Sequence, residues 1–201
     1  MKRLWKNELS RIIVSFLILV GLMASVAVMP VLTHVFGKEV VITAGAYNPS
    51  DVFRGSHLRL FYNIQEIPID SMDASLQALF EDDDYSIVQR TLQGQRIYVT
   101  FKETPNGFMV DQASRQRPNT PYYVRAEVNY VLFDWNTREI PDTNFEPTGV
   151  LKGIHVTYPA DRYYMSRSET ENLLQALRDQ DAIAHVKIWR GHMVLSRIES
   201  E

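Results

Sequence analysis

The segment FRGSHLRLFY, at positions 53–62, decides the interpretation of the fold. Its glycine, Gly55, is typical of a bend where the chain enters a sheet, because glycine tolerates positive φ and close backbone approach. Side chains alternate across a strand, so Leu60 and Tyr62 share one face while Arg59 lies on the other. An apolar face opposite a cation predicts a half-buried strand. Gly55, Leu60 and Tyr62 are its expected structural determinants.

Alternating or β-branched segments recur along the chain and predict about eight strands, four of them paired in two hairpins. The clearest hairpin turns at Thr104–Gly107, where Pro and Asn-Gly favour a tight turn. A second turns at Arg190–His192. The other predicted strands are Val40–Thr43, Tyr122–Val131 and Gly149–Tyr158. In Tyr122–Val131, the alternation assigns Tyr122, Val124, Ala126, Val128 and Tyr130 to the core face.

Two stretches carry helix signals. Ser168 and Glu171 fit a capping box at the start of an apolar stripe formed by Leu173, Leu174 and Leu177. Ser71 is a candidate cap for a shorter helix before the acidic run at 81–84. The pattern as a whole predicts a β-rich α+β domain. Its sheet is mainly antiparallel, barrel-like or two-layered, with one capped helix near the C-terminus.

An apolar segment precedes this domain. Residues 12–36 are almost wholly apolar and long enough to cross a hydrocarbon core of about 30 Å as a helix. Lys2, Arg3, Lys6 and Arg11 against Glu8 give the first eleven residues a charge of +3. By the positive-inside rule, residues 1–11 form a cytoplasmic basic tail, residues 12–36 span a membrane and residues 38–201 form an extracytoplasmic domain.

The main alternative for the same segment is a cleaved signal peptide. Ala24-Ser25-Val26-Ala27 offers small residues at a suitable spacing for cleavage. The apolar run continues through Leu32, however, which favours an uncleaved signal-anchor whose partner is the bilayer. Gly21 and Ser25, four residues apart, also allow close packing against another membrane helix.

Composition excludes several functions. The chain has no cysteine, so disulfides, thiolate metal ligands and cysteine nucleophiles are absent. The net charge of −3 leaves −6 beyond the basic tail. An acidic domain without a basic stripe does not predict nucleic acid as a partner.

Two sets of residues resemble a known family, the bacterial membrane-anchored proteins named for the motif G-D-Y-x-x-L-x-Y. Gly55, Leu60 and Tyr62 match the motif, with Ser56-His57 in place of Asp-Tyr and Arg54 in the lead-in; Leu58 and Arg59 lie inside it. Tyr163 and Tyr164, followed by the capped helix, resemble the family's aromatic pair near its C-terminus. The resemblance covers residues 38 to 198 and implies a single-pass protein with an extracytoplasmic β-rich domain, often encoded beside multi-pass membrane proteins.

No catalytic, cofactor or metal site is predicted. The favoured hypothesis is an accessory module that docks on a larger, multi-pass inner-membrane protein. One alternative is a small-ligand or metal sensor using His155, His185 and His192. Another is a membrane-tethered hydrolase that pairs Ser56 with Lys102 or Lys152. Arg54 and Arg59 are expected to form charge pairs within the fold.

Overall fold

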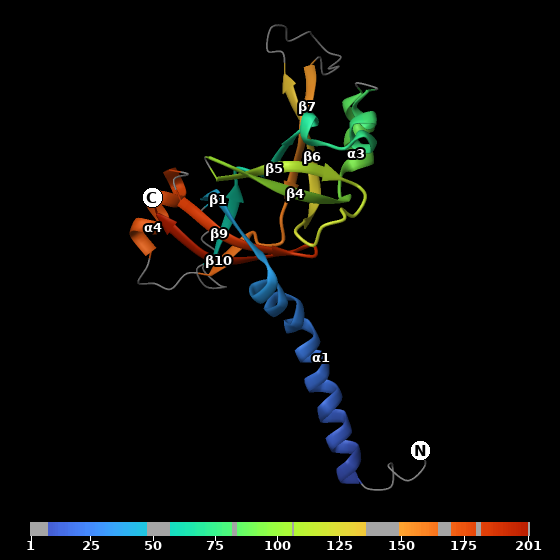
Figure 1. Cartoon of the computed structure of the whole chain (residues 1–201), viewed down its shortest axis with the longest axis vertical. Helices are drawn as coiled ribbons and strands as arrows, with labels where there is room; N and C mark the ends of the chain where they lie inside the picture. The colour runs from blue at the N-terminus through green and yellow to red at the C-terminus, as the bar shows by residue number, and fades with distance from the viewer. Residues whose placement is uncertain are drawn as a thin grey trace, which may run out of the picture.

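The computed structural model describes residues 8–47, 57–81, 84–105, 107–135, 149–164, 170–179 and 182–200. Its first element is a long helix, α1 (Glu8–Phe36), which projects from a β-rich domain (Figure 1). The part Ser10–Phe36 is long and apolar enough to cross a membrane. Most of its apolar side chains are exposed, and Val26 reaches 78 %. A single glycine, Gly37, separates α1 from the first strand.

The first sheet has five antiparallel strands and contains the motif strand. β1 (Lys38–Tyr47) lies at its centre, between β2 (His57–Tyr62) and β9 (Ala182–Trp189), and β10 (His192–Ser200) lies at the edge beyond β9. The hairpin predicted around Arg190–His192 forms its outer part, because β9 and β10 pair from Trp189 and His192 onward. The strand order is β10, β9, β1, β2, β8 (Arg162–Tyr164).

The second sheet also has five antiparallel strands. Its order is β3 (Glu66–Pro68), β7 (Gly149–Thr157), β6 (Val124–Trp135), β4 (Arg96–Thr104), β5 (Gly107–Ser114). The predicted β4–β5 hairpin is confirmed, with Thr104 opposite Gly107. A bridge between Val124 and Gly191 joins this sheet to the first. The two sheets enclose one hydrophobic core, so the domain is a nearly closed, barrel-like antiparallel structure.

The motif strand follows its predicted alternation. In β2, Leu60 and Tyr62 are each 2 % exposed, whereas Arg59 is on the exposed face. The predicted alternation in β6 was wrong at both ends. Tyr122 is 42 % and Tyr130 45 % exposed, because Tyr123 takes the buried position before the strand and a β-bulge shifts the register between Val128 and Tyr130.

The helices differ most from the prediction. Asp73, not Ser71, caps the first turn of α2 (Ala74–Gln77), since its carboxylate accepts from the Leu76 amide at 3.0 Å; Ser71 belongs to the 3₁₀ turn η1 (Ile69–Ser71). The predicted single helix in this region is therefore divided, and a second 3₁₀ turn, η2 (Ala78–Phe80), follows.

Another helix, α3 (Tyr85–Leu92), follows the acidic run and was not predicted. Asp84 caps it, because its carboxylate accepts from the amides of Ser86 and Ile87. Val88 and Leu92 are buried on its inner face. The last residue of the acidic run therefore has a structural role as a helix cap.

The predicted C-terminal helix is α4 (Thr170–Asp179), and its Leu177 is fully buried. The proposed capping residue Ser168 lies outside the described residues, and the side chain of Glu171 is not described. Arg54 and Gly55 likewise lie outside them. Two short strands, β3 and β8, were also missed by the sequence prediction.

The chain crosses between the two sheets twice at neighbouring points, and two tyrosines join these crossings. The β2–β3 turn leads from the first sheet to the second, and the β7–β8 connection leads back. The Tyr62 hydroxyl donates to the carbonyl of Ala160, and the Tyr158 hydroxyl donates to the carbonyl of Ile64 at 2.8 Å. Burial raises the pKa of both phenols, so they remain hydrogen-bond donors at any physiological pH.

Removing one of these hydroxyls should measurably destabilise the domain. Tyr158→Phe leaves the buried carbonyl of Ile64 without its partner, which costs about 1–3 kcal/mol. Urea denaturation of the full chain in detergent measures this loss. Tyr122→Phe removes an exposed hydroxyl and is the matched control, expected to change stability by less than about 0.5 kcal/mol. Equal stability of the two variants would show that the hydrogen bond to Ile64 contributes nothing.

Candidate functional site

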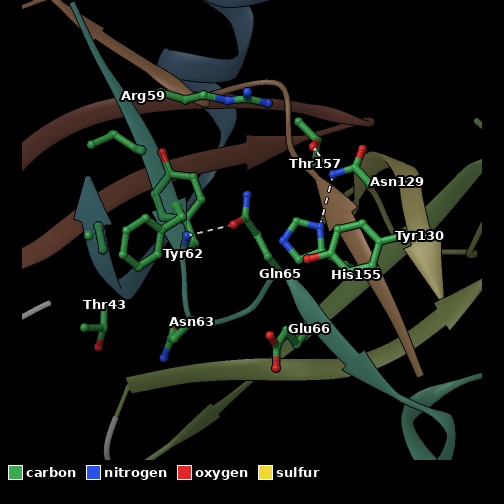
Figure 2. A pocket seen from close by; sticks show the side chains of 14 residues that line it. Thr43, Arg59, Tyr62, Asn63, Gln65, Glu66, Asn129, Tyr130, His155 and Thr157 are labelled. Atoms are coloured by element: carbon green, nitrogen blue, oxygen red, sulfur yellow. Dashed lines mark hydrogen bonds between the residues drawn. The ribbon is translucent and has the colours of Figure 1, made fainter. Parts of the chain in front are cut away.

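A polar cleft of about 620 Å³ opens beside the motif strand (Figure 2). Its walls come from both sheets, because β1 and β2 contribute from the first and β3, β6 and β7 from the second. The side chains that give it its polar character are Arg59, Gln65, Glu66, Asn129, His155 and Thr157. Tyr62, one of the two tyrosines at the crossing, also lines the cleft.

A β-bulge places the central polar residue of the cleft. Val128 pairs with Val156 and Tyr130 with His155, so Asn129 is an extra residue between two register positions. Such a bulge redirects a side chain out of the regular alternation. The Asn129 amide nitrogen lies 2.6 Å from Thr157 Oγ1 and 3.1 Å from His155 Nδ1. Both amide hydrogens are used when the imidazole proton is on Nε2, which leaves Asn129 Oδ1 and His155 Nε2–H available to a ligand.

The imidazole of His155 is held in place by stacking. Its ring lies parallel to that of Tyr130, with centroids 4.6 Å apart and an interplanar angle of 9°. Burial lowers the pKa of His155 below its usual 6.5; Glu66 opposes this shift and Arg59 adds to it. At neutral pH the ring is therefore uncharged and acts as a hydrogen-bond donor and acceptor.

Gln65 lies between Tyr62 and His155 in the cleft (Figure 2). Its side chain is 7 % exposed, and its Oε1 accepts from the amide of Tyr62 at 3.3 Å (Figure 2). Its backbone carbonyl accepts from the amide of Val156 at 2.9 Å. The turn after the motif strand is therefore fixed to β7, and the cleft is preformed on this side.

Of the motif residues singled out from the sequence, Arg59 and Tyr62 meet in the cleft, together with Leu60. Arg59 Nε lies 3.7 Å from Asp161 Oδ2, which agrees with the expected charge pair, but the arginine side chain is 62 % exposed and such a pair adds little stability. Tyr163 is half-buried against the core. Leu58 lies in β2 and Tyr164 in β8, opposite Tyr163 and His57 respectively, and their side chains are not described.

A second cleft of about 580 Å³ continues from the first, since Arg59, Asn129 and Thr157 line both. This cleft is basic. Its charged side chains are Arg59, Arg96, Arg125 and Glu127, and His192 also lines it. Arg125 Nη2 lies 3.5 Å from His192 Nε2, and both burial and the Arg125 charge lower the pKa of His192. Among the described carboxylates, none lies within 4.0 Å of Arg96 or Arg125.

The three histidines considered as metal ligands lie apart. His155 is in the first cleft and His192 in the second, whereas His185 on β9 lies 2.8 Å from Glu39 and 3.4 Å from Glu199. No group of three metal-ligating side chains converges within the described residues. Ser56, the candidate nucleophile, lies outside the described residues. Its two candidate bases are exposed and face carboxylates, Lys102 at 3.9 Å from Asp111 and Lys152 at 2.6 Å from Asp134.

Most of the cleft was not predicted from the sequence. Asn129 was assigned to the wet face of a regular strand, and Arg96 and Arg125 were not singled out, because neither the bulge nor the meeting of two sheets is visible as a local pattern. The groups present can bind a ligand through hydrogen bonds, a stacked imidazole and arginine charges. Their arrangement therefore suits recognition of a polar or anionic group.

Comparison with known proteins gives one match. The family model described as GDYXXLXY protein matches residues 19–198, which run from within α1 to within β10. No curated protein and no solved structure matches the chain. The match covers far more than half of the 201 residues.

Protonation of the cleft histidines should destabilise the domain. A folded-state pKa below 6.5 means that the unfolded imidazole binds its proton first as the pH falls. The free energy of unfolding therefore has its full value, as far as His155 contributes, above pH 6.5, and it decreases as the pH falls below that value. His155→Gln should therefore reduce the decrease in the free energy of unfolding at acid pH. Urea denaturation from about pH 8 to about pH 5 measures this dependence.

His192→Gln should flatten the same profile, because the pKa of His192 is lowered too. If the double variant His155→Gln, His192→Gln shows the same pH dependence of the free energy of unfolding as the unmodified protein, neither histidine has a lowered pKa in the folded state.

Proposed function

The chain belongs to the GDYXXLXY family, and we propose that it acts as a single-pass, membrane-anchored extracytoplasmic module that docks on a larger inner-membrane protein. The observation that carries this proposal is the direct connection of an exposed apolar helix to a domain with a preformed polar cleft. The helix holds the domain at the membrane, and the cleft beside β2 receives a segment of the partner.

The length and charge of α1 support a spanning, N-in orientation. Its apolar part has 27 residues, and at about 1.5 Å per residue it is about 40 Å long. That length crosses the hydrocarbon core of about 30 Å and reaches the headgroups on both sides. The basic tail before it belongs in the cytoplasm by the positive-inside rule, which leaves the domain outside.

Contacts at the end of α1 favour an anchor over a cleaved signal peptide. Ala24–Ala27, the small residues suited to cleavage, lie in the middle of the helix. The helix then continues to Phe36, whose ring packs against Trp189 at a centroid distance of 6.0 Å. Lys187 Nζ donates to the carbonyl of His34 at 2.7 Å. Cleavage near Ala27 would leave this packed segment as a free end.

Docking at the cleft is tested by photo-crosslinking in native membranes. A photoreactive phenylalanine replaces Asn63, which is exposed and lines the cleft, in the full-length chain. The expected result is an adduct with a membrane protein, identified by mass spectrometry. The same probe at Ile87, an exposed residue of α3 that lines neither cleft, is the matched control.

A further probe at Leu22, exposed in the middle of α1, tests docking through the helix. Gly21 beside it has open space where a side chain would begin, which leaves room for a neighbouring helix. If neither the Asn63 probe nor the Leu22 probe yields a protein adduct, the accessory-module proposal is wrong. The mass of the mature chain, measured in the same preparation, decides between anchor and cleaved signal peptide.

The basic cleft favours a second candidate, a receptor for a small anionic ligand. Arg59, Arg96 and Arg125 reach it from three strands, and Glu127 is its one carboxylate among the described lining residues. Arginine binds carboxylates and phosphates through two parallel hydrogen bonds. Millimolar phosphate or succinate should then raise the melting temperature of the full chain. The double variant Arg96→Gln, Arg125→Gln should lose this increase, whereas Arg90→Gln on α3 should keep it.

A further inference from the structure

We propose that the β9–β10 turn, with Trp189 and Arg190 at its tip, is a second membrane contact that lies in the phospholipid headgroup layer beside the end of α1. This inference rests on the proposed membrane-spanning role of α1. It adds a surface of the domain itself to the membrane contact. The partner is a layer of lipid phosphates and glycerol groups.

The turn is close to the end of α1 and tied to it. Phe36, the last residue of the helix, contacts the ring of Trp189, and Lys187 of β9 binds the helix carbonyl at His34. A side chain at Gly37 would begin 3.1 Å from Lys187 Cβ and would also meet the carbonyl of Thr33. Helix and hairpin are therefore in direct contact. In Figure 1 the hairpin runs along the edge of the domain from which α1 emerges.

The length of α1 sets the depth of the turn. A helix of about 40 Å equals the thickness of a bilayer with its headgroups, about 40–45 Å, so Phe36 lies in the outer headgroup layer when the helix spans. Trp189, in contact with Phe36, must lie at a similar depth. Tryptophan is enriched at this depth because its ring is largely apolar while its N–H seeks a polar partner.

The tip presents the groups that suit this layer. Trp189 is half-buried, and its indole N–H has no acceptor among the described residues. Arg190 is exposed and its guanidinium lies 4.8 Å from the centroid of the Trp189 ring. A guanidinium stacked over an indole remains charged, and its N–H groups can still donate hydrogen bonds to an anion such as a lipid phosphate.

The tip is also tied to the second sheet by backbone hydrogen bonds. Arg190 has a φ of 46°, a left-handed conformation that non-glycine residues rarely adopt. Three backbone hydrogen bonds hold the turn. The amides of Arg190 and Gly191 donate to the carbonyls of Pro121 and Tyr123, just before β6, and the Gly191 carbonyl accepts from the amide of Arg125 in β6. Close by, the exposed Tyr122 and the pair of Arg117 with Tyr123, 5.5 Å apart, extend the same combination of aromatic rings and cations.

Fluorescence quenching by labelled lipids tests this contact in the full chain. Trp5→Phe and Trp135→Phe leave Trp189 as the single tryptophan, and the protein is reconstituted in vesicles of phosphatidylcholine and phosphatidylglycerol. We expect spin labels near the headgroup to quench Trp189 more strongly than labels at the middle of the acyl chain. If neither the headgroup label nor the mid-chain label quenches Trp189, the proposal is wrong.

A second variant reports separately on α1. With all three native tryptophans replaced by Phe, Leu22→Trp places the only indole in the middle of the helix, where the mid-chain label should quench it. If that indole is quenched and Trp189 is not, the headgroup contact is wrong and the membrane anchor stands. If the mid-chain label does not quench the indole at position 22, both inferences fail.

Charge reversal tests the role of the arginine. Arg190→Glu should reduce the quenching of Trp189 by headgroup labels, because a carboxylate is repelled by lipid phosphates. Arg90→Glu makes the same change on α3, which lies at the end of the domain away from α1 (Figure 1), and should leave the quenching unchanged. Equal quenching in both variants would contradict a phosphate contact at Arg190.

Discussion

The domain depends on the reciprocal hydrogen bonds of Tyr62 and Tyr158. The Tyr62 hydroxyl donates to the β7–β8 connection, and the Tyr158 hydroxyl donates to the β2–β3 turn. The two places where the chain changes sheets are therefore held side by side. Both rings are almost fully buried, which makes each bond costly to break without a replacement partner. Tyr62, the last residue of the segment at positions 55–62, therefore helps to fix the place where the two sheets meet.

The meeting of the two sheets also explains the cleft. A continuous sheet would bury or expose side chains in strict alternation, whereas two sheets that meet at a crossing leave a space that neither fills. Gln65 fixes the turn on one side of this space, and the bulge at Asn129 directs an amide into it from the other. The stacked rings of Tyr130 and His155 then hold the donors and acceptors in fixed positions.

The sequence was sufficient for features that local patterns determine. The apolar helix, both hairpins and the faces of Leu60 and Tyr62 follow from periodicity and turn residues alone. Features that depend on tertiary contacts were missed. The three-residue strands β3 and β8 are too short to show alternation, and α3 is recognisable only once Asp84 is seen as its cap. The bulge in β6 was also missed, so Asn129 and Tyr130 were assigned to the faces of a regular strand and their place in the candidate site was not foreseen.

The absence of a linker between α1 and β1 has a mechanical consequence. One end of β1 follows the helix directly through Gly37, and its other part, at Ala44 and Gly45, forms a wall of the cleft. Helix, strand and cleft wall are thus continuous along the chain. In the membrane-spanning orientation proposed above, the tilt of α1 would set the direction in which the cleft opens, and this tilt depends on membrane thickness.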